Sequence, residues 1–134
     1  MQITKVSDGD SLRSGTLRIR LFGIDAPELN QECKDQNGRI WGCGIAAHRQ
    51  LVTLIGTKKE LQCSLRDVDR YGRLIMQCFT GSTDIGAAMV QSGHALAYRH
   101  FSDLYIADED QAKTAQKGIW RGIFVPPWEW RRNN

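Results

Sequence analysis

The chain has 134 residues, of which 41% are hydrophobic and 25% charged, within the range of one globular domain. Eighteen basic and fifteen acidic residues give a net charge of +3, which permits a polyanionic partner without requiring one. No apolar run approaches the roughly 20 residues of a membrane-spanning helix, and the composition argues against disorder. We therefore expect residues 1–134 to form a single domain with no membrane contact.

Four cysteines bear on the compartment: Cys33, Cys43, Cys63 and Cys78. No Cys-x-x-Cys pair and no histidine at zinc-finger spacing accompanies them, which argues against a structural zinc. Their even number allows two disulfides, with four buried free thiols in a cytosolic protein as the alternative. Residues 1–5 lack the apolar stretch of a signal peptide, so the protein is either intracellular or has had its signal peptide removed. The four cysteines favour the second interpretation, and we expect a secreted or periplasmic protein whose signal peptide is not in this chain.

Alternating polarity predicts three strands. Residues 16–22 place Ile19 and Leu21 on one face and Arg20 on the other, as in a half-buried strand. Residues 60–66 and 73–79 predict two more strands, which the turn signal Asp-Arg-Tyr-Gly between them joins into a β-hairpin.

The position of this turn sets a register. If it is centred between Arg70 and Tyr71, Cys63 lies opposite Cys78. Cross-strand neighbours of this kind have Cβ atoms about 4.5–5.5 Å apart, near the separation of a disulfide. Cys33 and Cys43 would then close a short polar loop.

Three helices are predicted, each with a stop signal typical of a helix end. They run over residues 44–55 before Gly56, from an Asp84 cap to Gly93, and over residues 103–117 between a Ser102 cap and Gly118. In the third helix Glu109 precedes Lys113 by four residues, the spacing of a favourable ion pair.

Carboxylates concentrate in two short segments, Asp8-Gly-Asp10 and Asp25-Ala-Pro-Glu28. Their oxygens suit a hard cation such as Ca²⁺, and the lack of histidine in either segment disfavours a softer metal. Taken alone, each segment is also compatible with an ordinary turn.

Two arginines favour a catalytic site over ordinary turns. Arg20 lies on the polar face of the first strand shortly before Asp25, and Arg73 follows the hairpin turn. Guanidinium groups beside a carboxylate-bound cation suit phosphodiester cleavage, because they bind phosphate oxygens and stabilise growing negative charge. Surface arginines paired with acids are the alternative.

Three motifs resemble, in order and spacing, the signature of the staphylococcal nuclease (thermonuclease) family: residues 8–11, 20–28 and 69–73. The resemblance continues through Tyr98, the third predicted helix, Gly118 to Trp120 and residues 124–131 of the tail. It implies an α+β fold, a five-stranded OB-fold barrel with three α-helices, in a monomer. The implied activity is Ca²⁺-dependent hydrolysis of DNA and RNA, single-stranded or frayed, with little sequence preference and 3′-phosphate products.

The resemblance also assigns residues to three roles. The Ca²⁺ ligands are Asp10, Asp25 and the backbone carbonyl of Ala26. The catalytic residues are Glu28, the candidate general base, with Arg20 and Arg73, which clamp the phosphate. The residues that line the nucleotide pocket are Arg70, Tyr71 and Tyr98, whose aromatic members suit base stacking.

This chain departs from the family pattern at several positions. Ala26 replaces a threonine, His100 stands where the pocket has a second tyrosine, and the four cysteines are additional. We expect Trp128 and Trp130 to pack back onto the domain. A catalytically silent OB-fold module that binds nucleic acid or protein is the alternative function, and the catalytic acids and arginines in the sequence favour the enzyme.

Overall fold

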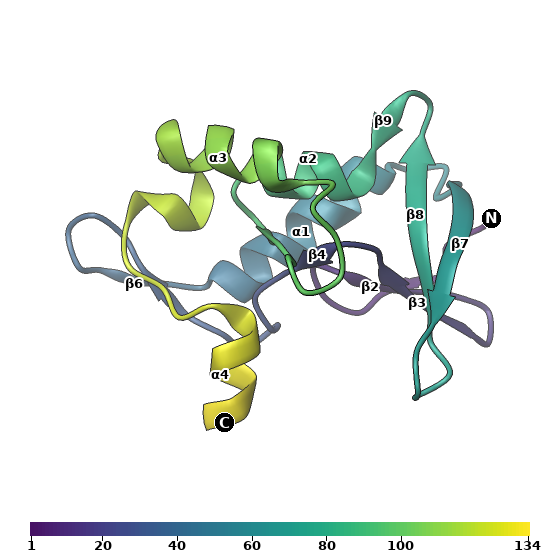
Figure 1. Cartoon of the computed structure of the whole chain (residues 1–134), viewed down its shortest axis with the longest axis horizontal. Helices are drawn as coiled ribbons and strands as arrows, with labels where there is room; N and C mark the ends of the chain where they lie inside the picture. The colour runs from purple at the N-terminus through teal and green to yellow at the C-terminus, as the bar shows by residue number, and fades with distance from the viewer.

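A computed structural model describes residues 1–134 as an α+β fold (Figure 1). The strands are β1 (Lys5–Val6), β2 (Ser11–Ser14), β3 (Leu17–Leu21), β4 (Ile24–Asp25), β5 (Cys33–Lys34), β6 (Ile40–Trp41), β7 (Gln62–Val68), β8 (Leu74–Thr80), β9 (Thr83–Asp84) and β10 (Leu96–Ala97). The α-helices are α1 (Cys43–Ile55), α2 (Ile85–Gln91), α3 (Ile106–Thr114) and α4 (Pro127–Asn133), and a 3₁₀ helix, η1, spans Gly118–Arg121. No helix has the length and apolar character needed to cross a membrane.

The main sheet has the strand order β1-β2-β3-β8-β7, and β9 pairs with the end of β8. The β3–β8 pair is parallel and the other pairs are antiparallel. Its two edges approach each other through the segments that precede β1 and β7, where Ile3 N–H donates to the Lys59 carbonyl and Leu61 N–H to the Met1 carbonyl. This arrangement agrees with the α+β OB-fold class predicted from the sequence.

The first predicted strand is β3. Ile19 and Leu21 are buried in the main hydrophobic core, and the Arg20 side chain lies on the opposite face, where it is 12% exposed. Leu17, at the start of the strand, is 47% exposed, so the buried face of β3 begins at Ile19.

The predicted hairpin register is confirmed. Cys63 pairs with Cys78 and Leu65 with Met76, and the two cysteines form a disulfide. A bulge after Leu65 shifts the pairing, so that Asp67 lies opposite Ile75. Only the half of the hairpin beyond the bulge, nearer the turn, departs from the simple register.

The second predicted disulfide, Cys33–Cys43, is also present. The loop that it closes is more ordered than its polar composition suggests, because β5 and β6 pair within it. Both cysteines are buried with Leu96 and Ile119 in a second, smaller apolar cluster. This cluster supports the C-terminal segment, since Phe124 and Trp128 pack against it.

The first two predicted helices are confirmed as α1 and α2, and the Asp84 side chain accepts the Ala87 N–H as a cap. The third prediction is too long at both ends, since α3 covers only Ile106–Thr114. Ser102 is not its cap; the hydroxyl accepts the Leu104 N–H in a preceding turn. Residues 103–105 form a separate turn instead, in which Ile106 N–H donates to the Asp103 carbonyl, and Tyr105 is buried with its hydroxyl bound to Asp84.

Two further sequence expectations about helices are wrong. Glu109 does not pair with Lys113, because its carboxylate is buried and accepts the Ala97 N–H and an Arg99 nitrogen. The chain also has four α-helices rather than three. The fourth, α4, begins with Pro127 at a first-turn position that favours proline, and it projects away from α2 and α3 (Figure 1).

Candidate active site

The two aspartates expected to bind the cation come together where three short strands meet. Asp10 lies immediately before β2, and its carbonyl accepts the Leu21 N–H of β3. Gly23, with φ of +76°, reverses the chain after β3, and Asp25 then pairs with Leu96 of β10. A side chain at Gly23 would meet the Tyr105 ring, so glycine suits both the turn and the packing.

Arg20 joins these two aspartates. Its Nη1 atom lies 3.1 Å from Asp10 Oδ2 and its Nη2 atom 3.4 Å from Asp25 Oδ1. Burial alone would raise the pKa of Asp10, but the charge of Arg20 together with hydrogen bonds involving Asp8, Ala26 and Ser11 outweighs burial and lowers this pKa below its usual value. The buried aspartates and Arg20 thus form one charge cluster.

Ala26 contacts the same cluster through its backbone. The Ala26 N–H donates to Asp10 Oδ2 at 2.8 Å, so the peptide of Ala26 lies directly against the carboxylate. The substitution of alanine for threonine therefore leaves the backbone contact in place, because that contact does not involve the side chain.

Glu28 lies at the rim of the cluster, and its side chain is 30% exposed. The backbone around it is fixed by α1: Gly44 packs so closely on the Glu28 carbonyl that a Cβ atom there would collide with it. The Glu28 N–H donates to the buried side chain of Gln31, and the Gln31 N–H donates back to the Glu28 carbonyl. A rigid backbone thus presents a partly exposed carboxylate.

A second arginine, which the sequence reasoning missed, completes the cluster. Arg131 of α4 binds Asp25 with two nitrogens, Nη1 to Oδ1 at 2.9 Å and Nη2 to Oδ2 at 3.0 Å. The same Nη1 atom lies 2.9 Å from Glu28 Oε1. No local signal marks this residue, because 106 positions separate it from Asp25.

The charge balance of the cluster fits a divalent cation. Asp8 lies beside Asp10, and the Asp10 N–H donates to the Asp8 carboxylate. Burial raises the pKa of Asp8 to about 7. Burial likewise raises the pKa of Asp25 to about 6, although the Arg131 hydrogen bonds oppose the shift. With all groups ionised, four carboxylates face two guanidinium groups, an excess of negative charge that a hard cation would relieve.

In this structure the carboxylates are paired with arginines. No group of three or more His, Cys, Asp or Glu side chains is arranged to hold a metal ion. The expected ligand set needs only two carboxylates and one backbone carbonyl, and the donors are oxygens that suit Ca²⁺. Asp10, Asp25 and Ala26 are the residues that would hold the ion.

Arg73 does not join the acidic cluster. Its Nε atom donates to Asp69 Oδ2 at 2.7 Å, and Asp69 also accepts the backbone N–H groups of Tyr71 and Arg73. Asp69 thereby fixes the hairpin turn and the arginine together, while the two terminal nitrogens of Arg73 make no hydrogen bond.

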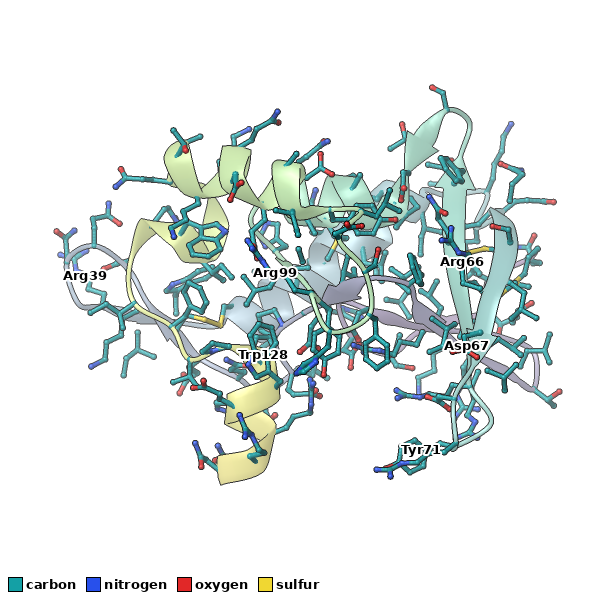
Figure 2. All side chains as sticks on the ribbon, in the orientation of Figure 1. Arg39, Arg66, Asp67, Tyr71, Arg99 and Trp128 are labelled. Atoms are coloured by element: carbon teal, nitrogen blue, oxygen red, sulfur yellow. A yellow bond between two sulfur atoms is a disulfide. The ribbon has the colours of Figure 1, made fainter.

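The expected nucleotide-binding residues are divided between two places. Tyr71 is 57% exposed at the hairpin tip, and the Arg70 guanidinium lies 4.9 Å from the centre of its ring and donates to its hydroxyl. Tyr98 follows β10, and the Arg20 guanidinium lies 5.8 Å from its ring centre. The hairpin tip and α4 extend on the same side of the molecule, with Tyr71 and Trp128 well apart (Figure 2).

Tyr98 is the centre of an aromatic group. Trp128 stacks on it with ring centroids 5.6 Å apart and planes at 11°, and His100 and Phe101 meet it edge-on. Phe101 is 68% exposed. The structure therefore places Trp128 back against the domain, as expected, and His100 beside Tyr98.

The mixed sheet and the four helices define an α+β fold of the OB class, with a buried acid–arginine cluster as its candidate site. The comparisons with known proteins point to the same class. A family model described as Staphylococcal nuclease homologue matches residues 18–122. The chain belongs to the staphylococcal nuclease family.

Individual relatives agree with this assignment. Micrococcal nuclease of Shigella flexneri is 32% identical, covering 98% of this chain and 79% of that protein. Succinoglycan biosynthesis protein ExoI of Rhizobium meliloti (strain 1021) is 31% identical over 87% of this chain, which spans 62% of its length. Probable staphylococcal-like nuclease CAN3 of Oryza sativa subsp. japonica is 31% identical over 98% of this chain, which spans 33% of its length. The chain thus spans less than two thirds of two of these three relatives.

Proposed function

We propose that the chain is a Ca²⁺-dependent nuclease that hydrolyses the phosphodiester bonds of DNA and RNA with little sequence preference. The observation that carries this proposal is the buried cluster of Asp10, Arg20 and Asp25 with Glu28 at its rim. Several family members with similar sequences are named nucleases, which supports the same activity.

The cluster favours catalysis over a silent binding module. Burying two aspartates and an arginine is costly unless the charges serve each other or a ligand, and hydrophobic residues often stabilise such positions better. A module that only binds nucleic acid needs exposed cations and aromatic rings, and it has no use for buried carboxylates. Asp10 at 4% exposure and Asp25 at 0% therefore support an enzyme.

In the proposed mechanism Asp10, Asp25 and the Ala26 carbonyl would hold Ca²⁺, which when bound would supply Lewis-acid polarisation of the scissile phosphate. Glu28 accepts a proton from the attacking water, a role that its partly exposed carboxylate suits. Arg20 donates to a phosphate oxygen and stabilises the negative charge that grows as the water attacks.

Arg73 acts from the hairpin side. Its terminal nitrogens are free to donate to the same phosphate or to the leaving oxygen, because Asp69 engages only the Nε side of the guanidinium. Tyr71 and Tyr98 offer ring faces on which unpaired bases stack, and Arg70 adds a positive charge beside Tyr71. This suits single-stranded or frayed substrates. The expectation of 3′-phosphate products comes from the family resemblance.

We further propose that residues 1–134 act as one staphylococcal nuclease-like domain and as a monomer. The two disulfides suit a secreted or periplasmic location, where they persist.

Product analysis tests this assignment. Purified protein is incubated with end-labelled single-stranded DNA, duplex DNA and RNA in millimolar Ca²⁺, and the ends of the products are identified. The proposal expects cleavage of all three substrates, fastest for the single strand, with 3′-phosphate ends. Folded protein that binds these substrates without cutting any of them would favour the silent module.

A further inference from the structure

Helix α4 places two side chains on the groups that the proposed reaction uses. Arg131 binds both oxygens of Asp25, the aspartate expected to hold the cation, and reaches Glu28, the candidate general base. Trp128, three residues earlier, stacks on Tyr98, the ring expected to receive a base. A positive charge and a flat aromatic ring thus lie where a cation and a nucleobase are expected.

The contact made by Arg131 conflicts with a cation at the same aspartate. A divalent ion held by Asp25 would lie within a few ångströms of the guanidinium, and like charges at that distance repel strongly in a partly buried site. The Arg131 side chain is 35% exposed, so it has an open path to solvent when the ion pair breaks.

The stack made by Trp128 conflicts with a base on the same ring face. Its planes are 11° from parallel at a centroid distance of 5.6 Å, the geometry that a stacked base would adopt. Because Arg20 lies on Tyr98 as well as on the two aspartates, the stacked ring and the acidic cluster are parts of one connected site.

The attachment of α4 is suited to release. The helix has seven residues, and Arg131 provides every side-chain hydrogen bond from it to the rest of the chain. The segment before it is anchored by the buried Gln31 amide, which donates to the Val125 carbonyl, and the first residue of the helix, Pro127, is buried. A helix this short has little stability of its own, so its position depends on the Arg131 and Trp128 contacts.

We propose that α4 is an internal strap that occupies the cation and base positions of the site and is displaced when Ca²⁺ and nucleic acid bind. This inference rests on the proposed function, since it assumes that Ca²⁺ binds at Asp10 and Asp25. Only molecules in which α4 is released can bind Ca²⁺. The apparent affinity for Ca²⁺ is therefore the intrinsic affinity multiplied by the fraction of molecules with α4 released.

Direct Ca²⁺ titration by calorimetry, without substrate, tests the strap with matched variants. Arg131→Gln is compared with Arg132→Gln, which removes the same charge from the next residue, exposed and without an ion pair. Trp128→Ala is compared with Trp130→Ala, which lies on the same helix without a stacking partner. Circular dichroism first establishes that each variant is folded.

The strap predicts that Arg131→Gln and Trp128→Ala both bind Ca²⁺ more tightly than the wild type, by about tenfold if α4 is seated in nine molecules of ten. The variants at positions 130 and 132 should stay within twofold of the wild type. Trp128→Ala is the decisive variant, because it removes no charge and acts on the cation only through the position of α4.

Two results would overturn the strap: an unchanged Ca²⁺ affinity in folded Trp128→Ala, or weaker Ca²⁺ binding in Arg131→Gln. Failure of the proposed nuclease function has a different signature, since it appears as Ca²⁺ binding without cleavage in every variant. If no variant binds Ca²⁺, the strap is wrong together with the Ca²⁺ assignment.

Discussion

Arg20 and Asp10 form an ion pair that is almost entirely buried. Their closest atoms, Nη1 and Oδ2, lie 3.1 Å apart, and the two side chains are 12% and 5% exposed. The same guanidinium also donates to the Ile24 carbonyl at 3.1 Å, so that one planar group ties β3 to the chain that follows it. This residue therefore matters for both the site and the fold.

Arg20→Lys keeps the positive charge and loses the planar, two-sided contact. We expect the cleavage rate to fall about 100-fold or more, because one positioned donor to the phosphate is lost. The free energy of unfolding should fall by about 1–3 kcal/mol as buried acceptors lose their partner. Initial rates on single-stranded DNA and urea unfolding measure the two effects, with Arg13→Lys on the exposed face of β2 as the control.

Glu28→Gln separates catalysis from stability. The carboxylate is partly exposed and its only side-chain partner is Arg131, so urea unfolding should change little. Loss of the proton acceptor should lower the cleavage rate by about 100-fold or more. Glu32 is a nearby exposed acid whose side chain makes no hydrogen bond or ion pair, so the Glu32→Gln variant should cleave at the wild-type rate. Full activity in the position-28 variant would remove Glu28 from the mechanism.

Tyr105→Phe tests the contact between the residue that precedes α3 and the cap of α2. The hydroxyl donates to the Asp84 carboxylate, with its two oxygens at 3.0 and 2.9 Å. We expect the free energy of unfolding to fall by about 1–3 kcal/mol, because a partly buried carboxylate that caps α2 loses one of its donors. Thermal or urea unfolding measures the loss, and an unchanged midpoint would show that the pair contributes nothing. Cleavage per folded molecule should not change.

His94 predicts a pH dependence of stability. Burial and the charge of Arg121 lower the pKa of His94 below its usual 6.5, and its Nδ1 atom is buried without a hydrogen-bond partner. As the pH falls through 6.5 the unfolded chain gains a proton that folded His94 resists, so stability is lost on acidification. Urea unfolding at pH 7.5 and pH 5.5 should show a larger loss in the wild type than in His94→Gln.

His100→Gln is the control for that comparison, because the His100 side chain is exposed. Its stability should follow the wild type at both pH values. Equal losses in the wild type and in His94→Gln would contradict the assignment of this pH dependence to His94.

The parts of the fold that local sequence determines were predictable. The position of the hairpin turn sets the register, which places Cys63 opposite Cys78. Gly56 ends α1 with φ of +79°, as a glycine stop signal indicates. The acids of the site were found because each lies in a short segment rich in turn and carboxylate residues.

The parts of the fold and of the site that depend on tertiary contacts could not be predicted from the sequence. The Ser102 cap signal was misleading, because its hydroxyl accepts the Leu104 N–H in a turn before α3, and Tyr105 at the end of that turn binds Asp84, 21 positions away. Glu109 serves the backbone of β10 instead of its helical neighbour Lys113. Arg131 reaches Asp25 only because α4 folds back onto the site, although proline at the first turn was a sign of that helix.

The measurement that tests the central claim most directly is digestion of single-stranded DNA by the purified protein, with millimolar Ca²⁺ in one sample and excess EDTA in the other. The account predicts cleavage with Ca²⁺, none with EDTA, and restored cleavage when Ca²⁺ is added back beyond the chelator. Cleavage that continues in EDTA would contradict the metal assignment to Asp10 and Asp25. Folded protein that fails to cleave with Ca²⁺ would contradict the proposed nuclease activity.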